Sequence, residues 1–167
     1  FVDWHVREHI PERVGLPGFL RGRRYVAIDG VPKYFNFYET TDTSALTSDA
    51  YRARLNAPTE WTTRVVAHFT DTSRTVCDVV ASFGCGEGAW IEAIRLSTSS
   101  DANAFRAGIA ENILRAASNA PGIVGVHLLR RAGEADGRAA CAHFDLHARR
   151  LAAGHQVGVL EDRVGAL

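Results

Sequence analysis

Side chains near the start of the chain recur with helical spacing. Trp4 and Glu8 are four residues apart, as are His5 and His9, so each pair lies on neighbouring rows of one amphipathic helix. Pro11 cannot donate a backbone hydrogen bond. It therefore either kinks this helix or occupies the first position of a new turn. The string "GLPG" then ends the helix.

Strict alternation follows and predicts strands. Residues 20–28 alternate, and after "DGVP" the string "KYFNFYET" alternates aromatic with polar side chains, which together predict a β-hairpin. "TSDAYRARLN" opens a helix with Ser48 as its N-cap, "PTEWTTRVVAHF" continues helically after Pro58, and "RTVCDVVASF" is the next strand. The first half thus runs helix, strand, strand, helix, strand, and lacks only one strand at its front.

The second half follows the connector "GCGEG". "AWIEAIRLS" predicts a strand, and "DANAFRAGIAENILRAASN" predicts a helix with Asp101 near its start. Phe105, Ile109 and Ile113 mark the expected buried face of this helix, with Ala116 in the next turn.

A repeat links the two halves. "APGIVGVHLLRRA" matches "LPGFLRGRRYVAI", with Pro121 in place of Pro17, and both segments read as helix, PG turn, strand. We therefore expect two related parts, residues 1–84 and residues 89–167. The second part looks incomplete, because too few residues separate its last strand-like segments to form a second amphipathic helix.

Composition narrows the class of protein. The 167 residues are 46% hydrophobic, enough for one good core or two small half-domains. Nineteen basic residues balance nineteen acidic ones, which disfavours binding to nucleic acid or an anionic membrane. With no apolar run of about 18 residues and no secretory pattern, a cytoplasmic protein is expected. Cys77, Cys85 and Cys141 are too scattered for a disulfide framework, so we expect reduced thiols.

The string "WHVREHIPERVGLPGFLRGRRY", with "PKYFNFYET", the helix around Tyr51, "HF" at His68 and the strand "VVASFGCGEG", resembles the EthD-like and related dimeric α/β-barrel proteins. The resemblance covers about the first hundred residues and is lost after Arg131. It implies an α+β fold of ferredoxin-like βαββαβ repeats with antiparallel sheets. Two such units form a barrel, so a homodimer or an intrachain pseudo-dimer is implied. Members of the family catalyse several reactions, so the resemblance does not select one.

His5 and His9 are the first candidates for chemistry. At i and i+4 they could ligate one metal or act as an acid–base pair, since imidazole titrates near neutral pH. The structural alternative is that His9 buttresses the helix end. No third metal ligand follows from the sequence, so no metal is expected. The resemblance implies a catalytic role, because the helix lies over the sheet where the family's pocket is found.

Further candidates would line that pocket with apolar walls and polar anchors. Arg23 and Arg24 point to opposite faces of their strand, so one of them faces inward or is covered by a helix. An inward arginine would need a carboxylate from the protein or from a substrate. Glu92 shares a face with Trp90 and Ile94, which would suit a general acid or base or a partner for an arginine. The expected substrate-binding residues are Trp4, Tyr25, Tyr34, Tyr38, Trp61, His68 and Glu92.

A second group of polar residues lies in "HFDLH". His143, Asp145 and His147 alternate on one face of a strand but span about 13 Å, too far for one metal ion, and a solvated strand face is the simpler interpretation. Nucleotide, phosphoryl and familiar hydrolase motifs are absent from the sequence. We expect a cofactor-independent enzyme that acts on a small aromatic or lactone-like molecule by proton transfer. The alternative is a ligand-binding or assembly module without turnover.

Overall fold

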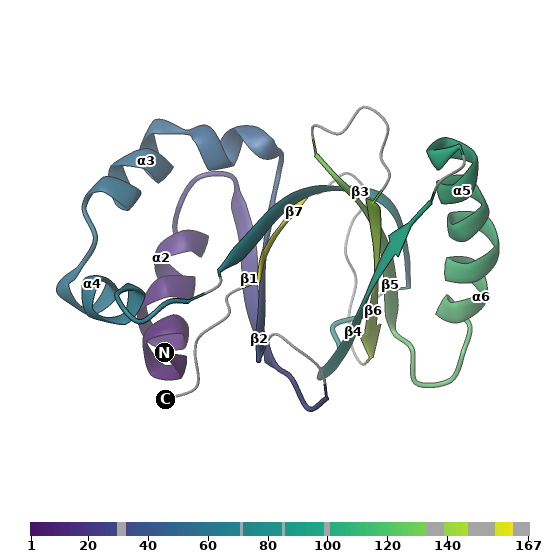
Figure 1. The fold of residues 1–167 in the computed structure, drawn as a ribbon, viewed down its shortest axis with the longest axis horizontal. Coiled ribbons are helices and arrows are strands. Elements are labelled where there is room, and N and C mark those ends of the chain that lie inside the picture. The colour runs from purple at the N-terminus through teal and green to yellow at the C-terminus, as the bar shows by residue number, and fades with distance from the viewer. Residues whose placement is uncertain are drawn as a thin grey trace. The chain divides into compact units, whose positions relative to one another are not determined.

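The computed structural model describes residues 1–29, 33–70, 72–84, 86–98, 101–132, 139–146 and 156–161, the last two segments as backbone only. The chain divides into a first unit, residues 1–76 with 156–167, and a second unit, residues 77–155. Each unit combines helices with antiparallel strands, so the fold is α+β (Figure 1).

The first unit begins with one continuous helix made of α1 (Val2–Trp4), η1 (His5–His9) and α2 (Ile10–Val14). In η1 the helix widens to a π turn, where the Ile10 N–H donates to the His5 carbonyl oxygen five residues back. Pro11 comes directly after this turn, near the start of α2. Pro11 has no N–H and therefore donates no backbone hydrogen bond within this continuous helix. Both alternatives for Pro11, a kink and the first position of a new turn, stay predictions.

The expected hairpin is present. β1 (Phe19–Val26) pairs antiparallel with β2 (Tyr34–Thr40), and β2 pairs antiparallel with β7 (Gln156–Glu161), giving the order β1-β2-β7. Gly22 lies opposite Tyr38 in this register, and a Cβ at Gly22 would come within 2.5 Å of the tyrosine ring. The absence of a side chain at Gly22 therefore lets the Tyr38 ring lie across β1.

Two capped helices follow the hairpin, after the short 3-10 helix η2 (Thr43–Thr47). Ser48 caps α3 (Asp49–Asn56), since its Oγ accepts a hydrogen bond from the Tyr51 N–H at 3.2 Å. Thr59 caps α4 (Glu60–Val66) in the same way. Each cap satisfies a backbone donor that the first turn leaves unpaired, and the prediction for Ser48 is confirmed.

The second unit has four antiparallel strands: β3 (Ser73–Gly84), β4 (Trp90–Ser97), β5 (Gly125–Arg131) and β6 (Ala139–Leu146). Their order is β3-β5-β6-β4, with β5 and β6 as the central hairpin. A single helix, α5 (Ala102–Gly108) with η3 (Ile109–Leu114) and α6 (Arg115–Ser118), connects β4 to β5. As expected, Asp101 caps it.

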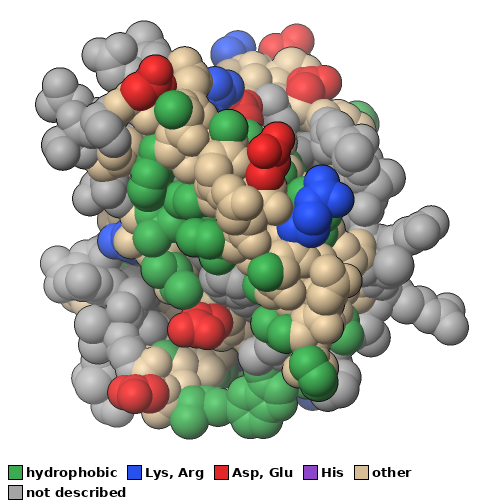
Figure 2. All heavy atoms as spheres, turned by 90° about the vertical axis from the view of Figure 1, so that its right-hand side faces the viewer, with side chains coloured by type: hydrophobic (Ala, Val, Ile, Leu, Met, Phe, Trp, Pro, Cys, Tyr) green, Lys and Arg blue, Asp and Glu red, His purple; other side chains and the backbone are tan. Residues whose placement is uncertain are grey.

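The core of the second unit is apolar. Ile109 and Leu114 from the helix pack with Val126 and Leu128 from β5, and all four are buried. The prediction that Ile113 belongs to this face is wrong, because its side chain is 54% exposed. η3 is a π turn, so the buried positions advance by five residues from Ile109 to Leu114 instead of four. Figure 2 shows hydrophobic side chains on the surface of this unit, and the large exposed ones are Val80, Trp90, Ile94 and Ile113.

The internal repeat is visible in the backbone. The turn hydrogen bond from Phe19 N–H to the Leu16 carbonyl recurs between Ile123 and Ala120. Gly18 and Gly122 both have a positive φ, 84° and 83°. The two π turns also begin at equivalent positions, His5 and Ile109. The offset that aligns Pro17 with Pro121 therefore aligns the π turn of the helix and the PG turn in both units, and β5 begins two residues later than the equivalent of Phe19.

Candidate functional site

The described part of the first unit gathers aromatic side chains around two histidines. The ring centroids of His5 and His9 are 5.4 Å apart, and the Trp4 ring lies 4.4 Å from that of His9. The Tyr38 ring reaches the same place from β2, with its centroid 6.4 Å from that of His5. Trp4, His5 and Tyr38 are all buried. We call this group, completed by Tyr34 and the arginines described below, the histidine cluster.

The histidines have unusual surroundings. The Tyr38 hydroxyl lies 3.4 Å from His5 Nε2, but the Nδ1 atoms of His5 and His9 are buried and have no hydrogen-bond partner among the described residues. Burial, with a smaller contribution from Arg24, lowers the pKa of His5 to about 4. Burial, with Arg13 as the next cause, lowers the pKa of His9 to about 3. Both imidazoles are therefore neutral at pH 7.

Two arginines complete the histidine cluster. Arg24, on β1, lies with its guanidinium carbon 6.0 Å from the centre of the Tyr34 ring. Arg13, on α2, is buried and lies 5.4 Å from the Tyr51 ring. An inward arginine is expected to need a carboxylate from the protein or from a substrate, and neither of these two residues forms an ion pair within the described ranges. Arg24 Nε and Arg13 Nη1 are buried and also lack a hydrogen-bond acceptor there.

The opposite face of the hairpin is arranged differently. Arg23 donates to the Tyr25 hydroxyl at 3.0 Å and lies over the Phe37 ring. Arg21 forms a short ion pair with the buried Glu39, at 2.6 Å. Arg23 and Arg24 thus lie on opposite faces as predicted, and the buried carboxylate lies on the face away from Arg24.

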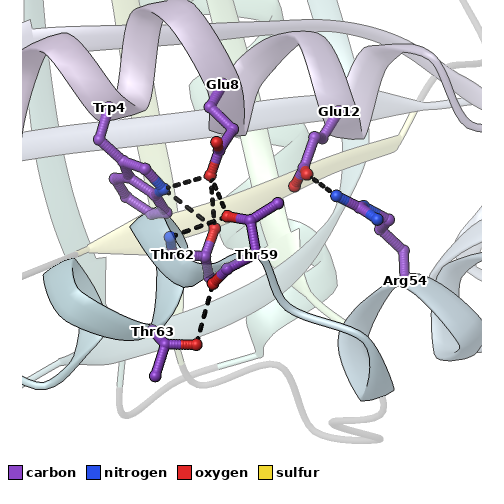
Figure 3. Close-up of polar contacts among 7 residues, drawn as sticks. All are labelled: Trp4, Glu8, Glu12, Arg54, Thr59, Thr62 and Thr63. Carbon is purple, nitrogen blue, oxygen red and sulfur yellow. Dashed lines mark hydrogen bonds and ion pairs between the residues drawn. The ribbon is translucent and has the colours of Figure 1, made fainter.

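A network of hydroxyl groups holds the outer side of the first helix (Figure 3). Glu8 accepts hydrogen bonds from the Thr59 hydroxyl at 2.5 Å, from the Thr62 hydroxyl at 2.9 Å and from the Trp4 indole N–H at 3.1 Å. The bond from Thr59 is the main cause of the lowered pKa of Glu8. Beside this network, Glu12 pairs with Arg54. These contacts fix the ring of Trp4 against the histidine cluster.

Of the other residues predicted to bind substrate, one lies in the histidine cluster and the rest lie outside it. Tyr34 is buried, whereas Tyr25 stacks on Phe37 on the other face of the hairpin. Trp61 is half-buried on α4, and His68 is exposed. Glu92 is exposed on β4 in the second unit, and Trp90 on the same strand is 56% exposed, so the expected apolar environment of this carboxylate is absent. The structure thus brings together Trp4, His5, His9, Tyr34 and Tyr38.

Sequence reasoning missed three contributors. Phe1 and Phe69 pack on the cluster, with the Phe1 ring 4.5 Å from Tyr34 and 5.3 Å from His5. Arg13 was also missed, although it follows His9 by four residues and so lies on the same row of the helix. That spacing is a signal that could have identified it.

No group of three His, Cys, Asp or Glu side chains in the described residues could hold a metal ion. The side chains of His143 and Asp145, the residue His147, and the thiols of Cys85 and Cys141 lie outside the described residues, whereas Cys77 is described and buried. None of the helices described is long and apolar enough to cross a membrane. Comparisons of the chain with family models, curated proteins and solved structures find no match.

Proposed function

We propose that the histidine cluster binds a small aromatic or lactone-like molecule and transfers a proton through His5 or His9. The observation that carries this proposal is the pair of buried Nδ1 atoms without a partner among the described residues. A buried polar atom without a hydrogen bond costs about 1–3 kcal/mol. Two such atoms, on side chains whose rings lie 5.4 Å apart, are well placed to hydrogen-bond one ligand.

The aromatic side chains of the histidine cluster support an aromatic ligand. Phe1 places a benzyl ring against Tyr34 and His5, at ring distances typical of aromatic pairs. The ring of an aromatic ligand would take a similar position, with Phe1 moving aside, and Trp4 would form a second wall.

Neutral imidazoles suit the first step of the proposed reaction. A carbon acid beside a carbonyl gives its proton to an unprotonated His5 or His9 nitrogen, and the electron pair of the broken C–H bond moves onto the carbonyl oxygen as an enolate. Return of the proton to another atom of the enolate completes an isomerisation without a cofactor. Tyr38, whose hydroxyl lies 3.4 Å from His5 Nε2, would donate a hydrogen bond to the enolate oxygen in the role that we propose for a tyrosine that orients the substrate.

One observation favours the alternative function, binding without turnover. A histidine with a pKa of about 4 is a weaker base than an ordinary histidine by about two and a half pKa units. Such a residue accepts a proton from carbon slowly. The binding module and the enzyme share the same site and differ only in whether a proton moves.

We further propose that the chain is an EthD-like protein of ferredoxin-like repeats that works as a homodimer or an intrachain pseudo-dimer. Two observations support this proposal. In both units a helix, a PG turn and a hairpin follow one another along the chain. In both units a third strand also pairs antiparallel with the second strand of the hairpin: β7 pairs with β2, and β4 pairs with β6. This is the order that a ferredoxin-like sheet requires.

Two measurements test the proposed function. Binding of 4-fluorophenol, followed by fluorine NMR, is expected for the unaltered chain and for His68→Gln, whose histidine is exposed, but not for His5→Gln or His9→Gln. Incubation of α-phenyl-γ-butyrolactone in D₂O is expected to incorporate deuterium next to the carbonyl only with the unaltered chain and the His68 control. Binding without deuterium incorporation would establish the binding module, and equal results for all four proteins would exclude the cluster as the site.

A further inference from the structure

We infer that the ligand of the histidine cluster carries a carboxylate, which Arg24 binds beside His5. This inference rests on the proposed function and names its substrate class, an aromatic carboxylate. Its basis is a comparison of equivalent positions in the two units.

The two units use different residues at equivalent buried positions. The offset that aligns the PG turns places His5 at the position of Ile109, Arg13 at that of Ala117, and Arg24 at that of Leu128. The three second-unit residues all belong to the apolar core of their unit. At these three positions a helix and a strand of this kind therefore pack with apolar residues, and packing gives no reason for a histidine and two arginines there.

Positions that do serve packing remain apolar in both units. Ile10 and Phe19 pack in the first unit, and their equivalents Leu114 and Ile123 pack in the second. At these packing positions both units keep apolar residues, whereas the first unit has polar residues at His5, Arg13 and Arg24.

Charge on the surrounding elements points to an anion. The first helix and the two strands of the hairpin carry four carboxylates, and each has protein partners: Asp3 with Arg7, Glu8 with the hydroxyls of α4 and its cap, Glu12 with Arg54, and Glu39 with Arg21. Arg24 and Arg13 retain no carboxylate among the described residues. Arg13 is buried, and Arg24 is half-buried with its Nε atom fully buried. A guanidinium withdrawn from water in this way needs a compensating charge, and a planar carboxylate is the anion that it binds best.

The neighbours of Arg24 select an aromatic carboxylate over an inorganic anion. Arg24 lies by the Tyr34 ring, and Tyr34 and His5 both contact the Phe1 ring. A benzoate-like ligand would place its ring where Phe1 now lies and its carboxylate at Arg24. A spherical anion could not replace the ring contacts that Phe1 makes with Tyr34 and His5.

The test compares 4-fluorobenzoate with 4-fluorobenzamide, a neutral molecule of the same shape, by fluorine NMR at one ionic strength. The unaltered chain is expected to bind the benzoate at least about tenfold more tightly. Arg24→Leu introduces the leucine that the second unit has at the equivalent position. It is expected to remove the preference for benzoate over benzamide, while benzamide affinity stays within about threefold of that of the unaltered chain. Arg7→Leu removes an exposed arginine from the same unit and is expected to keep the preference. Arg24→Gln provides a second variant if Arg24→Leu does not fold.

The outcomes separate the inference from the proposed function. Equal binding of benzoate and benzamide to the unaltered chain would overturn the carboxylate inference and leave the aromatic site standing. A preference that survives in Arg24→Leu and Arg24→Gln would overturn the assignment to Arg24. If neither probe, nor 4-fluorophenol, binds the unaltered chain, the proposed function itself fails and the inference with it.

Discussion

The two units contain the same succession of helix, PG turn and strand but bury different chemistry. In the second unit, Ile109 and Leu128 pack together in a core of apolar side chains. In the first unit, the equivalent His5 and Arg24 are neighbours, and both have buried nitrogen atoms without partners among the described residues. The comparison teaches that the local structure does not require the polar residues, so their presence is better explained by a ligand.

The comparison predicts the largest change in the free energy of unfolding when an arginine is placed in the second unit, at the position equivalent to Arg24. Leu128 is fully buried, and Leu128→Arg places a cation in an apolar core that offers no partner among the described residues. The free energy of unfolding is expected to fall by about 4 kcal/mol or more, as measured by urea denaturation.

The matched control is Leu128→Met, which conserves volume and polarity and should cost less than about 1.5 kcal/mol. If Leu128→Arg were as mild as this control, the second unit could accommodate a cation at that position, and the contrast between the two interiors would be lost.

Acid is expected to destabilise the first unit through its histidines. In the folded chain the pKa of His5 is lowered from 6.5 to about 4, so the unfolded state takes up the proton first as the pH falls. Stability from this group is complete above about pH 6.5 and is lost as the pH falls toward 4. The shift corresponds to roughly 3 kcal/mol, and His9, with its pKa lowered to about 3, adds to the loss at lower pH.

After burial, Arg24 on β1 and the amino group of Phe1 lower the pKa of His5, and Arg13 on α2 lowers that of His9, so these charges favour the neutral imidazole. Urea denaturation between pH 7 and pH 4 measures the effect. His5→Ile, which introduces the residue of the second unit, should flatten the profile by the contribution of His5, whereas His68→Gln should not. An unchanged slope in His5→Ile would show that His5 is not buried in its neutral form.

The two glycines of the PG turns should differ in their tolerance of alanine. Gly122→Ala places a side chain in open space at a positive φ, which costs about 1 kcal/mol. Gly18→Ala meets the same backbone cost, and its new Cβ would also lie only 2.8 Å from the Cβ of Ala45. We expect a further loss of at least about 1 kcal/mol there, since overpacking typically costs 1–3 kcal/mol.

Thermal denaturation of the two variants measures this difference. Adding Ala45→Gly to Gly18→Ala should recover part of the extra loss, after allowing for the cost of Ala45→Gly alone. Equal losses for Gly18→Ala and Gly122→Ala would mean that η2 can move away from the PG turn.

The sequence predicted the strands, the capped helices and the repeat, because alternation, Ser48, Asp101 and the two PG turns are local signals. It misplaced Ile113, because a helical pattern assumes 3.6 residues per turn and neither π turn has a recognisable signal. A π turn adds a residue to the helix, and only the packing in three dimensions reveals it.

The candidate site was predicted in part for a related reason. His5 and His9 are close together because four residues separate them on one helix, and alternation places Tyr34 and Tyr38 on one face of β2. The lack of a carboxylate partner for Arg24 depends on which side chains reach it from other elements. Strand alternation gives the face on which Arg24 lies but not its neighbours there, so sequence alone left open whether the expected carboxylate comes from the protein or from a substrate.

The smallest expected change in stability, that of Arg24→Leu, tells most directly why the first unit has an arginine where the second has an apolar residue. Arg24→Leu removes the buried Nε that lacks a partner among the described residues and introduces the residue that the second unit buries at the equivalent position. Without ligand, the free energy of unfolding is expected to rise by about 1 kcal/mol, measured by urea denaturation at pH 7. Arg7→Leu, an exposed substitution, should change it by less than about 0.5 kcal/mol. A protein that gains stability when it loses Arg24 keeps this residue for binding, whereas a loss of stability would assign Arg24 to the fold.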